Sequence, residues 1–136
     1  MAAESLVESK FEASKQLVND LIARGARVLA VYWEFREEVD RWTLVLVPES
    51  EDFERGLLNL AVDLLVEPPY RSVFSLSEPS IDSRQIKRAK ALGAYLHIAP
   101  YVGRRIDRTF TGGQYFESVV PVYLAPELMT HLSVAS

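Results

Sequence analysis

The chain has 136 residues, with 15 Lys and Arg, 19 Asp and Glu and a formal net charge of −4, and it has no Cys. The lack of Cys excludes thiol catalysis, iron–sulfur ligation, zinc fingers and disulfide scaffolds. A content of 49% hydrophobic and 25% charged residues is typical of one globular domain. The first residues lack the pattern of a secretion signal, and no apolar run could span a membrane, so we expect a cytoplasmic protein without membrane contact. We expect no cofactor and no metal.

Residues 5–24 are predicted to form the first helix. Ser5 and Glu8 have the spacing of a capping box, and apolar residues follow at helical period as far as Gly25.

Residues 28–47 predict an antiparallel hairpin, because two alternating apolar runs flank a charged break. A register with Phe35 opposite Trp42 also aligns Trp33 with Leu44, so one face of the hairpin carries both tryptophans. The other face carries polar residues near the turn and is expected to be partly wet, as is common in antiparallel sheets. These polar residues are Tyr32, Glu34, Arg36, Arg41 and Thr43.

Acidic residues gather near the turn of this hairpin and could supply metal ligands or an acid–base pair. They are Glu34, Glu37, Glu38 and Asp40. The second strand of the hairpin has neither the acid nor the Lys that a restriction-type nuclease places there. A hydrolase or nuclease-like enzyme is therefore the least favoured interpretation.

Residues 51–66 predict a second helix whose apolar residues cover more than the usual stripe of a surface helix. Its broad apolar surface favours a partner, either another protein or a second copy of the chain. Residues 71–76 predict a short strand, and residues 83–92 a short third helix that ends near Gly93. The conformation of residues 94–103 stays open.

Residues 104–124 predict a second hairpin with its turn at Gly112 and Gly113, in a register that places Ile106 opposite Val119 and Arg108 opposite Glu117. The tripeptide of residues 112–114, Gly-Gly-Gln, resembles the loop of class I peptide release factors and related ribosome-rescue hydrolases. The strand-forming residues that follow it, and the lack of a long basic tail, favour a plain hairpin turn. The whole order predicts one α+β domain with a mixed, mostly antiparallel sheet and helices over one face.

Charge is divided unevenly along the chain. Residues 1–83 have 8 basic and 16 acidic residues, whereas residues 84–108 have 7 basic residues and one acid. The favoured interpretation is a non-catalytic cytoplasmic interaction domain that acts through protein surfaces, with a homodimer as one form. The alternative is a nucleic-acid-binding protein that uses this basic segment. Under either interpretation the candidate contact residues are Arg84, Lys87, Arg88, Lys90, Arg104, Arg105 and Arg108.

Overall fold

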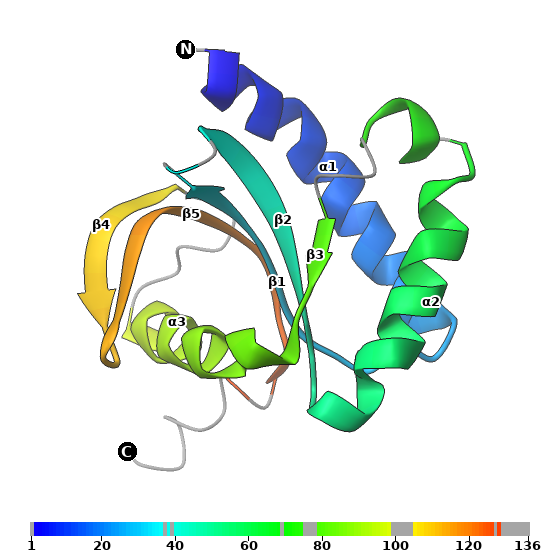
Figure 1. Ribbon diagram of the computed structural model, residues 1–136. Coiled ribbons are helices and arrows are strands. Elements are labelled where there is room, and N and C mark those ends of the chain that lie inside the picture. The colour runs from blue at the N-terminus through cyan, green and yellow to red at the C-terminus, as the bar shows by residue number, and fades with distance from the viewer. Residues whose placement is uncertain are drawn as a thin grey trace.

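The computed structural model describes residues 2–36, 38, 40–68, 70–74, 79–98, 105–126 and 128. It confirms an α+β fold with a mixed sheet of five strands (Figure 1). Short 3₁₀ turns lie at Glu51–Phe53, Tyr70–Ser72 and Ser83–Gln85. The helices and strands, in chain order, are α1 (Ala2–Ala23), β1 (Val28–Arg36), β2 (Arg41–Pro48), α2 (Glu54–Leu65), β3 (Pro79–Ile81), α3 (Ile86–Ile98), β4 (Ile106–Thr111) and β5 (Gln114–Leu124).

The strands lie in the order β3-β2-β1-β5-β4, and only the β2–β3 pair is parallel. The register predicted for the first hairpin is confirmed, because Phe35 pairs with Trp42 and Trp33 with Leu44. β1 is the central strand, since β2 pairs with one of its edges and β5 with the other.

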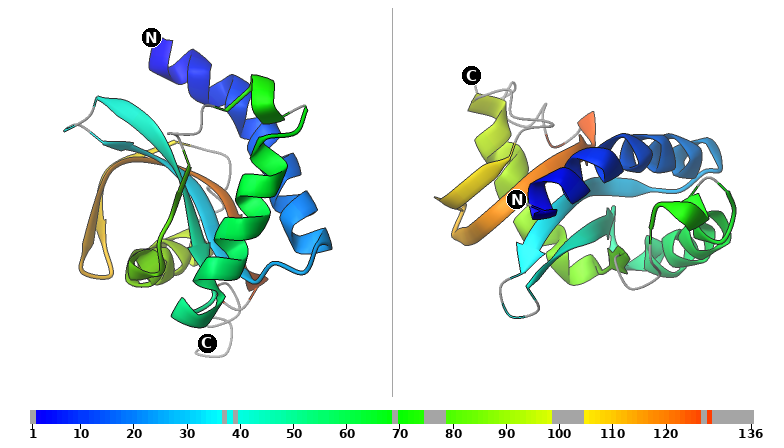
Figure 2. Two further views of the ribbon diagram at one scale, coloured as in Figure 1. Left: turned by 45° about the vertical axis from the view of Figure 1, so that its right-hand side comes forward. Right: turned by 90° about the horizontal axis from the view of Figure 1, so that it is seen from above.

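Both faces of the sheet are covered, which corrects the expectation that helices cover only one. α1 and α2 lie side by side on one face (Figures 1 and 2), and α3 lies on the other, inside the curve that β5 and β4 form. The face predicted to be partly wet is therefore a second core, in which Tyr32 is fully buried and Glu34 is only 9% exposed. The sequence concealed this core because the cation that pairs with the buried Glu34 is Arg88, which α3 supplies from a distant part of the chain.

The second hairpin follows its predicted course, with Ile106 opposite Val119. Arg108 has a positive φ of 44° and reaches Glu117 across the hairpin at 3.8 Å. Gly112 and Gly113, at φ 57° and 79°, form the turn. A Cβ atom on Gly112 would lie 2.7 Å from the Cβ of Ala91 in α3, so this glycine also lets the turn approach the helix.

Two predicted elements differ from the structure. A strand was predicted over residues 71–76, but residues 70–72 form a 3₁₀ turn. The short strand lies instead at Pro79–Ile81. Residues 75 and 76 lie outside the described residues. The third helix does not end near Gly93 but continues to Ile98. A Cβ atom on Gly93 would lie 3.1 Å from the Cβ of Leu128, so this glycine serves close packing within the helix rather than its termination.

Candidate functional site

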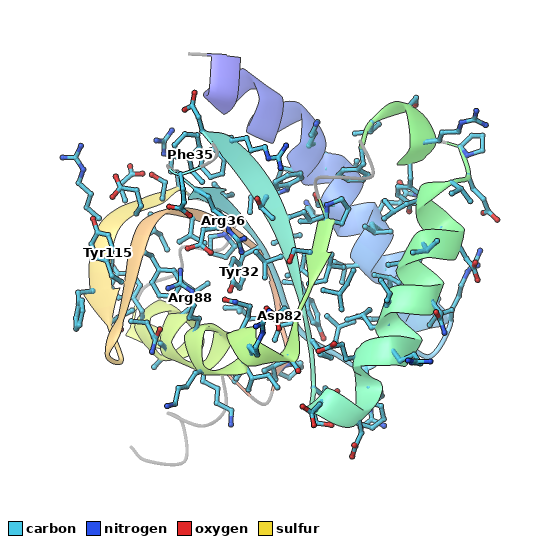
Figure 3. The ribbon with its side chains drawn as sticks, in the orientation of Figure 1. Tyr32, Phe35, Arg36, Asp82, Arg88 and Tyr115 are labelled. Carbon is cyan, nitrogen blue, oxygen red and sulfur yellow. The ribbon has the colours of Figure 1, made fainter. Side chains whose placement is uncertain are left out.

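The most concentrated polar chemistry lies between α3 and the curved sheet, where Figure 3 shows Tyr32, Arg36 and Arg88 gathered. β1 directs Glu34 toward α3, and the Arg88 guanidinium of α3 forms an ion pair with its carboxylate. Only 11% of the Glu34 side chain and 21% of the Arg88 side chain are exposed. The sequence made Arg88 a candidate contact residue for a partner, whereas the structure directs its side chain into the fold.

The Arg88 guanidinium is held by two further contacts. Its Nη1 donates a hydrogen bond to the backbone oxygen of Tyr115 at 2.8 Å, and its Cζ lies 4.2 Å from the centre of the Phe116 ring. The ion pair, the hydrogen bond and the cation–π contact together join α3 to both β1 and β5.

Burial has the largest influence on the pKa values of Glu34 and Tyr32. It raises the pKa of Glu34 above the usual carboxyl value, although the positive charges of Arg88 and Arg36 act in the opposite direction. Burial and the Glu34 carboxylate likewise raise the pKa of Tyr32, whereas Arg88 lowers it. Among the described residues, no hydrogen-bond acceptor or donor meets the buried Tyr32 hydroxyl at normal geometry.

A cavity of about 490 Å³ opens above this cluster. Three carboxylates line it, those of Glu34, Glu38 and Glu117, together with the guanidinium groups of Arg36 and Arg88. Two of the carboxylates are already engaged, because Glu34 pairs with Arg88 and Glu117 accepts a hydrogen bond from the Tyr115 hydroxyl at 3.0 Å. The cavity can admit a polar group, but its lining combines three carboxylates with two guanidinium groups and so offers no strong excess of either charge.

The acidic residues of the first hairpin are brought together only in part, because Glu34 and Glu38 line the same cavity. Glu34 is buried under α3, whereas Glu38 and Asp40 are exposed at the turn, and Glu37 lies outside the described residues. Across the described parts of the chain, His, Asp and Glu side chains do not form a group of three or more that could hold a metal ion.

The predicted basic contact residues do not form one continuous patch either. Four of them pair with carboxylates: Arg84 with Asp82, Arg88 with Glu34, Arg105 with Asp107 and Arg108 with Glu117. Lys87 and Lys90 line a common cavity beside α3. Arg104 lies outside the described residues. Several of these cations thus form local ion pairs, as Arg84 does when its Nε donates to the Asp82 carboxylate at 3.0 Å.

A second candidate surface is the outer side of α2. The helix buries Leu57, Ala61, Leu64 and Leu65 against the sheet, so the core absorbs part of the apolar surplus seen in the sequence. What remains outside is a row of three side chains spaced four residues apart. These are Leu58, Val62 and Val66, which are 43%, 47% and 50% exposed. We call this row the α2 stripe.

Comparisons with protein-family models, with curated proteins and with solved structures gave no match. None of the helices in the described residues combines the length and the apolar character needed to cross a membrane.

Proposed function

We propose that this chain is a non-catalytic interaction domain that binds another protein surface through the α2 stripe. The observation that carries the proposal is the exposure of Leu58 and Val62 on α2 and of Val66 at its C-cap, each about half open to solvent. Covering the exposed half of one such side chain is worth about 1 kcal/mol. A contiguous apolar row on an otherwise polar helix surface is typical of the centre of a protein interface.

The polar cluster supports this choice over an enzyme. Its most perturbed carboxylate, on Glu34, is engaged by Arg88, and both side chains are largely buried beneath α3. A general acid or base must reach a substrate proton within hydrogen-bond distance. The contacts of this pair instead connect a helix to two strands, which favours a structural role.

The surroundings of the α2 stripe support a protein over a nucleic acid as the partner. Exposed acids lie in the 3₁₀ turn before α2, within the helix and just after it, namely Glu51, Asp52, Asp63 and Glu67. Their negative charge repels a phosphate backbone. We propose that the domain works in the cytoplasm. A chain without Cys forms no disulfides and so does not depend on an oxidising compartment.

Site-specific photocrosslinking in the native cells tests this function. A benzophenone amino acid at position 62 should give one discrete crosslinked product, and Leu58→Glu should abolish it because it places a charge within the stripe. The same probe at position 110 is the matched control, because Phe110 is 72% exposed but lies on β4, away from α2. Equal, diffuse labelling from positions 62 and 110 would refute the proposed function.

A further inference from the structure

We infer that the α2 stripe docks on a second copy of this chain, with the two α2 helices antiparallel. This inference rests on the proposed function and names its partner. It follows from the order of apolar and charged residues along α2 and in Val66 and Glu67, which follow the helix directly. That side is open to a partner, because α2 and α1 form the outermost layer on their face of the sheet (Figures 1 and 2).

The stripe is symmetric about its central residue. Leu58 and Val66 lie four positions before and after Val62, which at 1.5 Å per residue places each about 6 Å away along the helix axis. A twofold axis through Val62 therefore places Val62 against its own counterpart. It also places Leu58 against Val66 of the second copy, twice. A closed dimer requires this kind of self-complementary patch.

The charges at the two ends of the stripe select the antiparallel arrangement. Arg55 is exposed before the stripe and Glu67 after it. An antiparallel copy brings Arg55 near Glu67 and near the C-terminal end of the other helix, where a cation is favoured. A parallel copy would instead place Arg55 beside Arg55. Within the described residues, the Glu67 carboxylate forms a long ion pair of 3.9 Å with Arg24, in which both side chains are about half exposed.

The interface should be weak. One pair of helices with three apolar residues from each copy covers less surface than the roughly 1,200 Å² at the lower end of stable complexes. We therefore expect a dimer in reversible exchange with the monomer, with a Kd in the range of tens of micromolar, rather than an obligate dimer.

Sedimentation equilibrium of the purified chain between 5 and 500 µM tests the inference. The wild-type protein should dimerise. Val62→Glu should weaken dimerisation at least tenfold, because it places the carboxylates of the two copies against each other at the axis. Phe110→Glu is the matched control, since it adds the same charge at an exposed apolar position on β4 and should leave the dimer unchanged. A wild-type protein that is monomeric at 500 µM would overturn the inference, as would a dimer that Phe110→Glu abolishes and Val62→Glu does not.

A charge exchange tests the direction of the helices. Arg55→Glu and Glu67→Arg should each weaken the dimer by placing like charges at its ends, and the double variant should restore it. Both residues are exposed, so neither change threatens the fold. Two single variants without effect, or a double variant weaker than either, would exclude the antiparallel register.

Single-cysteine variants provide a third test, because the chain has no Cys of its own. Under mild oxidation Val62→Cys should form a disulfide with its own copy, whereas Phe110→Cys should not. A mixture of Leu58→Cys and Val66→Cys should crosslink more than either alone. If the purified chain stays monomeric while the probe at position 62 captures a different protein in cells, the second-copy inference fails and the proposed function stands. If both experiments are negative, both fail.

Discussion

Removing the Arg88 guanidinium should destabilise the protein far more than a typical substitution at a helix surface. Arg88→Met keeps an unbranched apolar stem but removes the guanidinium, so the Glu34 carboxylate, 11% exposed, loses its cation. Leaving one member of a buried ion pair without its partner costs about 3 to 5 kcal/mol. We expect a value near the lower limit, about 3 kcal/mol, because the cavity above the pair lets water reach the carboxylate. For a chain of this size that loss lowers Tm by about 10 °C.

The pH dependence separates this mechanism from lost packing. Because burial raises the pKa of Glu34, the folded state binds its proton more readily than the unfolded state, and stability falls as pH rises through the window above the ordinary carboxyl value. Arg88→Met removes a charge that lowers this pKa. The destabilisation measured by urea unfolding should therefore be large at pH 7 and smaller at pH 4, where Glu34 is protonated.

A double variant completes the test. Glu34→Leu combined with Arg88→Met removes both charges, and a buried pair can be replaced by apolar side chains at little cost. The double variant should therefore be more stable at pH 7 than Arg88→Met alone. A double variant as unstable as the single one, or a destabilisation by Arg88→Met that is equal at pH 4 and pH 7, would refute the reasoning.

The other expectations concern the tryptophans, the hairpin turn and the basic segment. Trp33→Phe should lower the free energy of unfolding, measured with urea, by about 1 kcal/mol more than Trp42→Phe does. The Trp33 indole N–H donates a hydrogen bond to the Ser14 hydroxyl at 2.9 Å, whereas the Trp42 indole N–H is buried with no partner among the described residues. Equal costs would contradict this assignment. Gly112→Ala should lower Tm more than Gly113→Ala. Both glycines have a positive φ, but only a Cβ atom at position 112 would meet Ala91. A larger loss of Tm in Gly113→Ala would show that the turn can move away from Ala91. For residues 84–108, fluorescence titration should detect no salt-sensitive binding of DNA or RNA, and submicromolar binding at physiological salt would favour the nucleic-acid alternative.

The fold was largely predictable from local sequence patterns. Alternating apolar residues predicted both hairpins with their registers, because side chains that share one face of a sheet must repeat every second residue. Helical period predicted α1 and α2 closely, but the capping box predicted at Ser5 was wrong, because α1 begins at Ala2 and Ser5 lies inside it. The third helix was predicted too short, because a glycine within a helix is indistinguishable in sequence from a terminating one. Gly93 is explained only by its contact with Leu128, which is distant in the chain.

The polar cluster was not predictable in the same way. Glu34 was taken for a residue of a wet sheet face, and Arg88 for a surface cation, because each has an ordinary local pattern. Their pairing depends on α3 lying in the curve of β5 and β4, which is a tertiary arrangement. One signal was available: an acid within the strongly apolar run of β1 requires a cation if both faces of that strand are buried. For the α2 stripe, sequence showed the apolar surplus but not which residues the core would absorb.

The central position of β1 has a consequence for synthesis of the chain on the ribosome. Its edge toward β2 can pair as soon as the first hairpin has emerged, but its other edge must wait for β5, since Ala30 pairs with Leu124. During translation of the intervening residues, the nascent chain exposes an apolar strand with one open edge. Such edges recruit other strands. We therefore expect ribosome-bound chains that stop before β5 to bind chaperones, and that binding to end once Leu124 has left the exit tunnel.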